Sequence, residues 1–211
     1  MDEKIEVGID EAGRGCVLGP LVMAGVWVKP SSRHWLEKWN VNDSKAYGSA
    51  PSGKALREKL AEKIKARFSY QIVSLEPELI DRYVRKQGLN RLEQETALNI
   101  LQKSDFDLAL LDGENLFKPI TDLNIIAKNK ADRDHLSVAA ASILAKDKRD
   151  RELESMLKPY EVHLGPIRGG GYPNAQTLLF LKWFLKQHGT LPAFYRKSYQ
   201  WKAMKETLNA D

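Results

Sequence analysis

The segment "KIEVGIDEAGRG", residues 4–15, decides how the rest of the sequence is interpreted. Its first half alternates apolar residues with Glu6, Gly8 and Asp10, and this period of two predicts a β-strand. The strand then runs into Asp10 and Glu11, two like charges side by side, and each opposes the ionisation of the other. Such a pair needs a positive charge or open water close by.

Composition restricts the class of protein. The 211 residues are 43% hydrophobic and 29% charged, which is typical of one soluble globular domain. No apolar run reaches the ~18 residues of a membrane-spanning helix, and the acidic start lacks the apolar segment of a signal peptide. The single cysteine, Cys16, excludes an internal disulfide and a cysteine-based zinc site, and it favours a reducing compartment. We therefore expect a cytoplasmic monomer that makes no membrane contact.

The net charge of +5 is unevenly distributed along the sequence. Residues 1–161 contain 26 basic and 26 acidic residues, whereas residues 162–211 contain seven basic residues against Glu206 and Asp211. The second segment also holds aromatic residues, among them Tyr172 and Tyr199, and basic side chains interleaved with aromatics suit a nucleic acid surface. A solvated helical face above an aromatic core explains the same composition, and composition alone favours that interpretation.

Strand and helix patterns alternate along the chain. Apolar segments predict strands at residues 4–10, 19–30, 68–76, 106–112 and 123–132. Spacing of three and four predicts helices at residues 53–68, 76–88, 90–104, 134–157, 175–189 and 198–208. This order predicts an α/β protein with a mixed five-stranded sheet flanked by helices, its first two strands forming a hairpin. We expect a catalytic domain at residues 1–165 and a C-terminal helical segment at 166–211 that contacts substrate and does not fold independently.

Four carboxylates stand at the ends of apolar segments: Asp10, Glu11, Asp112 and Asp132. In an open sheet, groups at strand ends converge on the crevice that binds ligands, and Asp10 and Asp112 become neighbours if their strands are parallel. Asp132 lies near the start of the long helix, where the helix dipole favours a negative charge. Clustered carboxylates suit Mg²⁺ or Mn²⁺, and a pair of such ions promotes in-line displacement at phosphorus. Taken singly, the same residues also fit a turn, a helix cap and a solvated strand end.

Five motifs give the sequence a family resemblance. They are "GIDEAGRG" (8–15), "DSK" (43–45), "LLDG" (110–113), "KAD…SVAAASILAKDKRD" (130–150) and "GGGYP" (169–173). In this order, and across nearly the whole chain, they resemble type 2 ribonucleases H, also called ribonuclease HII. The ending "RKSYQW" (196–201) resembles that of archaeal members. The resemblance implies a ribonuclease H-like sheet and a Mg²⁺- or Mn²⁺-dependent endonuclease.

The resemblance also implies roles for individual residues. Asp10, Glu11, Asp112 and Asp132 match the catalytic, metal-binding carboxylates of the family. Gly13, Arg14 and Gly15 match the segment that grips the nucleotide whose 2′-hydroxyl marks the cleavage site. The chemistry is consistent, because glycines let the backbone approach a ribose and the 2′-hydroxyl distinguishes RNA from DNA. A simple turn between two strands is the alternative for this segment.

Further substrate contacts follow from the same resemblance. Tyr172 matches the tyrosine that packs on the sugar beside the scissile junction, although a loop anchor packed in the core fits too. Lys45 matches the lysine near the phosphate. The remaining candidates for backbone contacts are Lys146, Arg149, Arg196 and Lys197. Gly170 stands where many relatives have serine, which removes one hydroxyl contact.

The resemblance implies hydrolysis of the RNA strand of RNA/DNA hybrids and cleavage on the 5′ side of single ribonucleotides embedded in duplex DNA. As in the family, the products are expected to carry 3′-hydroxyl and 5′-phosphate ends. One alternative is a DNA-directed nuclease of the same fold, against which the "GRG" segment argues. Another is a catalytically inactive hybrid-binding module, against which the four intact carboxylates argue. The four histidines show no close metal-ligand spacing.

Overall fold

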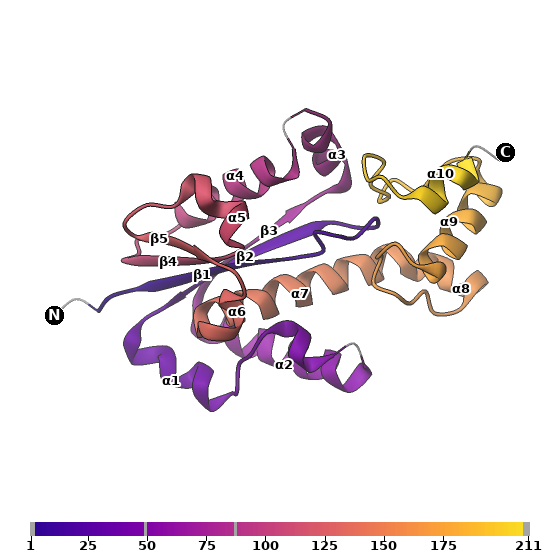
Figure 1. The fold of residues 1–211 in the computed structure, drawn as a ribbon. Helices are drawn as coiled ribbons and strands as arrows, with labels where there is room; N and C mark the ends of the chain where they lie inside the picture. The colour runs from indigo at the N-terminus through magenta and orange to yellow at the C-terminus, as the bar shows by residue number, and fades with distance from the viewer. Residues whose placement is uncertain (1–2, 49, 87, 209–211) are drawn as a thin grey trace. The chain divides into compact units, whose positions relative to one another are not determined.

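The computed structural model describes residues 3–48, 50–86 and 88–208, and it contains a five-stranded sheet (Figure 1). The strands are β1 (Glu6–Ala12), β2 (Leu21–Val28), β3 (Ser69–Leu75), β4 (Leu108–Asp112) and β5 (Ile125–Lys128), in the order β3-β2-β1-β4-β5. Strand β1 pairs antiparallel with β2 and parallel with β4, which in turn pairs parallel with β5. The predicted mixed five-stranded sheet and its opening hairpin are confirmed.

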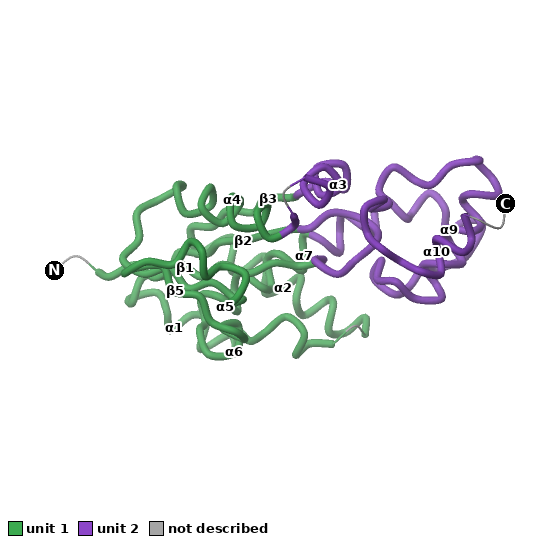
Figure 2. Tube along the Cα trace, turned by 45° about the horizontal axis from the view of Figure 1, so that its top comes forward, with its two compact units in different colours: residues 1–12, 22–74, 90–148 green, residues 13–21, 75–89, 149–211 purple. Residues whose placement is uncertain are grey.

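The chain forms two compact units, each assembled from separate segments (Figure 2). Unit 1 contains residues 1–12, 22–74 and 90–148, and unit 2 contains residues 13–21, 75–89 and 149–211. The acidic end of β1 therefore belongs to unit 1, whereas the "GRG" segment that follows it belongs to unit 2. The predicted division at residue 165 rests on composition and stays a prediction.

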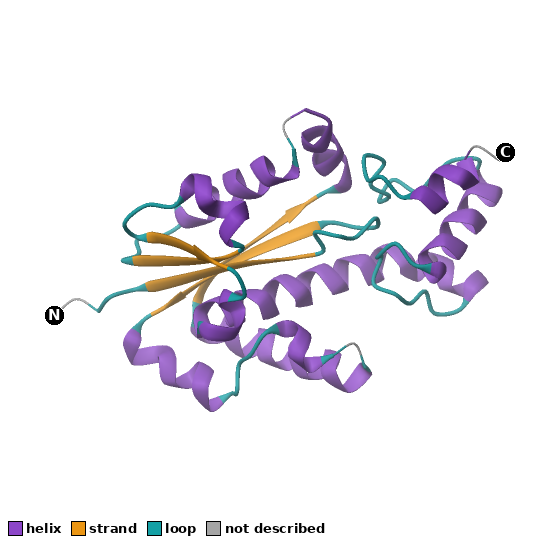
Figure 3. Cartoon of the chain, viewed as in Figure 1, coloured by secondary structure: helices purple, strands orange, loops and turns teal. Residues whose placement is uncertain are grey.

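The helices are distributed over both units, and those of unit 1 flank the sheet, as the sequence pattern predicts (Figure 3). They are α1 (Pro30–Lys38), η1 (Ser44–Tyr47), α2 (Pro51–Arg67), α3 (Pro77–Lys86), α4 (Leu89–Leu101), α5 (Glu114–Phe117), η2 (Lys118–Ile120), α6 (Ala131–Asp134), α7 (Leu136–Leu157), η3 (Lys158–Tyr160), α8 (Glu161–Leu164), α9 (Ala175–His188) and α10 (Lys202–Leu208). Helix α1 was not expected from the sequence, because Leu36 is its one buried residue and gives no apolar period. None of the helices in the described part of the chain is long and apolar enough to cross a membrane.

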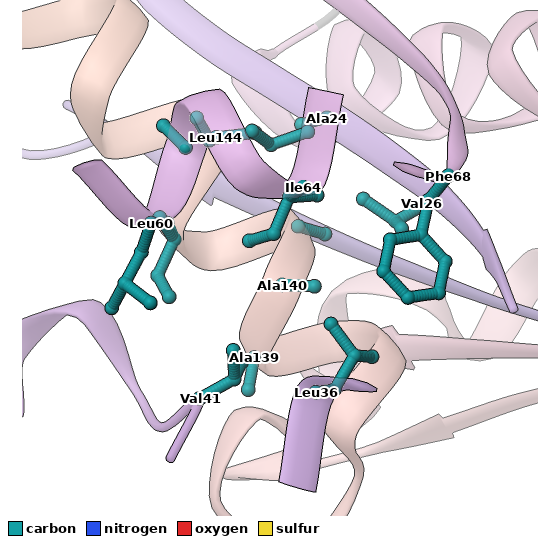
Figure 4. Close-up of a cluster of buried hydrophobic side chains, with 14 of the residues drawn as sticks. Ala24, Val26, Leu36, Val41, Leu60, Ile64, Phe68, Ala139, Ala140 and Leu144 are labelled. Carbon is teal, nitrogen blue, oxygen red and sulfur yellow. The ribbon is translucent and has the colours of Figure 1, made fainter. Parts of the chain in front are cut away.

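The main core of unit 1 lies between the sheet and helices α1, α2 and α7. Figure 4 shows Leu36, Ile64 and Ala140 meeting there with side chains from β2. The alanines of α7 let this helix pass very close to the sheet. A Cβ on Gly8 of β1 would lie 2.2 Å from the backbone nitrogen of Val138, so no larger residue fits at that position. The small residues of "SVAAASILAK" (137–146) therefore allow close packing of α7 against the sheet.

Candidate metal centre and substrate loop

Three of the four predicted carboxylates come together in unit 1. Asp10, Asp112 and Asp132 each offer a carboxylate oxygen, and these oxygens all lie within 4.8 Å of one another. The sheet explains the first two positions, because parallel pairing of β1 with β4 sets Ile9 beside Leu111 and so brings the following aspartates together. Asp10 is 4% exposed and Asp132 is 3% exposed. The expected pairing of strand ends is therefore confirmed.

The third carboxylate reaches the group through a short separate helix. Asp132 lies just before the long helix α7, as expected, but within a separate short helix, α6, that the sequence analysis did not predict. The extended backbone of His135 (φ −127°, ψ 118°) interrupts the helix between them. Lys130, the residue before α6, has a left-handed backbone conformation (φ 63°). The N–H of Ala131, the first residue of α6, donates to Asp112 Oδ1 over 2.8 Å. This hydrogen bond ties α6 to the end of β4.

Glu11 lies outside the three-carboxylate group in the described part of the chain. Successive strand residues point to opposite faces, so Glu11 cannot follow the direction of Asp10 while β1 stays regular. The Glu11 N–H donates to Asp10 Oδ1 over 2.8 Å. Next to burial, the charge of Glu11 is the second cause that raises the pKa of Asp10. A role for Glu11 as a metal ligand remains a proposal.

The electrostatics of the group favour a cation. Burial raises the pKa of Asp10 well above its usual range, Glu11 and Asp112 add to the rise, and a hydrogen bond from Ser142 opposes it. Burial, together with Asp112 and Asp43, raises the pKa of Asp132 to about 6. Buried carboxylates that resist ionisation are stabilised by positive charge, and hard divalent cations prefer oxygen ligands. The donor set therefore fits Mg²⁺ or Mn²⁺.

Lys45 supplies positive charge at the edge of this group. Its Nζ lies 4.0 Å from Asp132 Oδ2, and its side chain is 79% exposed. Burial lowers the pKa of Lys45, but the nearby carboxylates, led by Asp43, outweigh this effect and leave the pKa raised. Asp43 accepts a hydrogen bond from the Lys45 backbone N–H over 2.9 Å, which starts η1. The predicted position of Lys45 near a reacting phosphate is consistent with this placement.

Two serines that the sequence analysis did not single out support Asp10. The hydroxyls of Ser44 and Ser142 are hydrogen-bonded over 2.9 Å, and Ser142 in turn bonds to Asp10. Both serines are buried. The "DSK" motif marks the position of Ser44, but nothing in the sequence pairs it with a residue of α7.

The substrate loop, defined here as Gly13–Gly15, lies in unit 2 with the predicted tyrosine. Gly13 has φ +90°, and a Cβ there would lie 2.8 Å from Pro20 O, so glycine is required. Arg14 and Gly15 are exposed, and Tyr172 is 48% exposed. A Cβ on Gly15 would contact Tyr172 Cε1 at 3.6 Å, so the ring lies beside the loop. The structure therefore brings the predicted loop and tyrosine together.

The other predicted basic contacts divide into two groups. Lys197 is exposed and Lys146 is half-buried, so both keep accessible surface. Arg149 and Arg196 are fully buried. Contact of a phosphate with either guanidinium does not fit this burial, and the expectation is corrected for both residues. Instead, Arg149 Nη2 donates to the Leu18 carbonyl and Arg196 Nε donates to the Gly19 carbonyl.

The aromatic residues of the C-terminal segment pack mainly into the core of unit 2. The Tyr160 ring contacts those of Phe184 and Phe180 at centroid distances of 5.3 and 5.5 Å. Phe180 is 1% exposed and Tyr195 is 5% exposed. For these residues the core interpretation of the composition holds, and Tyr172 is an exposed exception.

Comparisons with known proteins agree with this geometry. Residues 7–202 match the family model described as Ribonuclease HII. The chain is 37% identical over 204 residues to Ribonuclease HII from Methanobrevibacter smithii, an alignment covering 92% of this chain and 94% of that protein. It is similar to the crystal structure of the ribonuclease H2 from Pyrococcus horikoshii OT3, with a TM-score of 0.81, 30% identity and 98% of both chains covered. Ribonuclease HII from Archaeoglobus fulgidus, solved in a complex with PCNA, gives a TM-score of 0.76 at 32% identity, covering 91% of this chain and 92% of that one.

The sequence motifs, the sheet order and the acidic group at its edge agree with these matches. The family model spans almost all of the chain, and the identity to the curated relative extends over nearly its full length. The chain therefore belongs to the ribonuclease HII family and is a metal-dependent endonuclease of the ribonuclease H type.

Proposed function

We propose that this protein hydrolyses the RNA strand of RNA/DNA hybrids and cuts on the 5′ side of single ribonucleotides embedded in duplex DNA. The products carry 3′-hydroxyl and 5′-phosphate ends. The observation that carries the proposal is the buried group of Asp10, Asp112 and Asp132, with Lys45 at its edge. A phosphodiester is anionic. The cation that these carboxylates would hold and the exposed ammonium of Lys45 together supply the positive charge that attracts it.

The metal is proposed to be Mg²⁺ or Mn²⁺, held by Asp10, Asp112 and Asp132 with help from Glu11. The fit rests on the oxygen donors, their mutual distances and the raised pKa values of Asp10 and Asp132. Held by these residues, two such cations would supply activation of the attacking water and charge stabilisation of the leaving oxygen. The hydrogen bond of Ser142 holds the Asp10 carboxylate in place, and the Ala131 N–H does the same for Asp112.

Recognition of the ribonucleotide is assigned to the substrate loop and Tyr172. Gly15 presents bare backbone, and a ribose can approach bare backbone closely. The exposed Tyr172 ring beside it offers an apolar face for a sugar. Because the 2′-hydroxyl distinguishes the two sugars locally, backbone donors in this loop support selection of RNA. Lys45, Lys146 and Lys197 supply charge for the phosphate backbone.

The test compares three duplexes of one sequence: all-DNA, RNA/DNA hybrid, and DNA with one internal ribonucleotide. With Mg²⁺ or Mn²⁺ the protein should cut the last two, and the single-ribonucleotide product should map to the 5′ side of that nucleotide. EDTA should stop both reactions. Cleavage of the all-DNA duplex would favour the DNA-directed alternative. Binding of the hybrid without cleavage under either metal would favour an inactive binding module.

A further inference from the structure

Two buried arginines donate to the backbone of the segment that carries the substrate loop. Arg196 donates from Nε to Gly19 O over 2.9 Å and from Nη1 to Arg14 O over 3.2 Å. Arg149 donates from Nη2 to Leu18 O over 3.2 Å. Burying a guanidinium is costly unless its donors are satisfied. Here the main-chain carbonyls of this segment are among the acceptors, so the two charges act on backbone conformation.

The Arg14 carbonyl is held from two sides. It accepts from Tyr199 Oη over 2.8 Å as well as from Arg196 Nη1. Arg196 Nη1 also donates to Tyr199 Oη over 2.9 Å, and the guanidinium lies 5.1 Å from the centre of the tyrosine ring. The three groups form a closed triangle of hydrogen bonds. A carbonyl held in this way cannot rotate without breaking two bonds.

The direction of this carbonyl determines the direction of the next amide. In a trans peptide the C=O and N–H point to opposite sides. The chain contains no cis peptide among its described residues. Since the Arg14 carbonyl points toward Arg196 and Tyr199, the Gly15 N–H points away from them. Gly15 is exposed and lies beside Tyr172, so its amide is on the open side of the loop.

The Arg149 side chain lies between this loop and the glycine-rich loop that carries Tyr172. A Cβ on Gly13 would lie 3.0 Å from Arg149 Nε, and one on Gly171 would lie 3.1 Å from Nη2. The guanidinium therefore fills the space between two glycines, one in each loop. Gly171 O also accepts from the Val17 and Leu18 amides over 2.8 and 3.1 Å. These contacts explain why both loops need glycine at these positions.

We propose that Arg196 and Tyr199 are positioning residues for ribonucleotide recognition. They fix the Arg14–Gly15 peptide so that the Gly15 N–H faces the ribose, and Arg149 sets the distance to Tyr172. Neither Arg196 nor Tyr199 touches the reacting atoms. This inference rests on the proposed role of the substrate loop.

Tyr199→Phe tests the inference with the smallest change, because it removes only the hydroxyl from the triangle. Steady-state cleavage of the single-ribonucleotide duplex is measured with Mg²⁺, together with the inhibition constant of the matched all-DNA duplex as competitor. We expect kcat/KM to fall about tenfold, the equivalent of about one hydrogen bond, while the all-DNA inhibition constant stays within about twofold. Arg196→Lys, which keeps one charged donor, should give a smaller loss in the same direction.

The matched control is Tyr160→Phe, which removes a hydroxyl from the aromatic core of the same unit and should leave both constants unchanged. If the role of Tyr199 is purely structural, Tyr199→Phe should weaken the interaction with both duplexes equally. That result overturns the inference. If kcat/KM for the single-ribonucleotide duplex is unchanged in Tyr199→Phe, the inference is overturned as well. If Arg196→Lys does not fold, Tyr199→Phe decides alone. Failure of the unmodified protein to cleave any ribonucleotide substrate would instead refute the proposed function.

Discussion

Replacing Asp132 with asparagine should stabilise the metal-free protein at neutral pH. The pKa of Asp132 rises from an ordinary value of 3.8 to about 6, mainly through burial and then through Asp112. The folded protein binds the Asp132 proton more tightly than the unfolded chain does, so protonation of Asp132 stabilises the fold. This stabilisation is complete below about pH 4 and is lost as the pH rises through about 6. This rise in pKa corresponds to at most about 3 kcal/mol at pH 7.5, and solvent screening reduces that figure. Asparagine has the same shape and removes that cost.

The assay is urea unfolding in EDTA at pH 7.5 and at pH 4. At pH 7.5, Asp132→Asn should raise the free energy of unfolding by up to about 3 kcal/mol, or the melting temperature by roughly 6–12 °C, and at pH 4 the gain should fall below about 1 kcal/mol. The control is Asp134→Asn, an exposed aspartate of the same short helix, for which we expect less than about 0.5 kcal/mol. Saturating Mn²⁺ should stabilise the unmodified protein more than Asp132→Asn. If Asp132→Asn is no more stable than the unmodified protein at pH 7.5, then the buried charge of Asp132 does not destabilise the metal-free fold, and this account is refuted.

Three further variants test separate parts of the account. Asp112→Asn should reduce cleavage by more than about 100-fold in a gel assay while duplex binding, followed by fluorescence anisotropy, stays within about threefold; unchanged turnover would remove Asp112 from the catalytic set. Gly8→Ala should destabilise the protein by about 3 kcal/mol or more in urea unfolding, because its Cβ would lie 2.2 Å from the backbone of Val138, and a loss below about 1 kcal/mol would contradict that packing. Gly15→Ala should keep its unfolding free energy within about 0.5 kcal/mol, since the new Cβ meets only Tyr172 at ordinary contact distance, yet it should lower cleavage of the single-ribonucleotide duplex; retention of full activity would argue against a ribose at this position.

The metal centre could be anticipated from the sequence because local patterns determine most of it. Alternation in residues 4–10 predicts a strand that ends at Asp10, and the apolar run before Asp112 predicts another. If these strands are parallel neighbours, the two aspartates must meet, and the observed register of Ile9 with Leu111 brings them together. The alanine-rich helix beside them was likewise predictable, because small residues allow close packing.

Other features depend on contacts that no local pattern contains. The separate helix α6 exists because His135 is extended and Ala131 bonds to Asp112, and both follow from tertiary structure. Arginine is typical of surfaces, but Arg149 and Arg196 are buried, and each donates to a backbone carbonyl distant in sequence. The sequence motifs do not show which arginines are buried, so both are expected at the substrate. The direction of Glu11 relative to Asp10 also depends on strand geometry, which a list of motifs does not include.

Anomalous scattering from crystals soaked in Mn²⁺ tests the central claim most directly, because it locates the metal without reference to activity. We predict a strong peak bonded to carboxylate oxygens of Asp10, Asp112 and Asp132, and its absence from crystals of Asp112→Asn soaked in the same way. Peaks confined to other acidic residues, with none among these three carboxylates, would contradict the account.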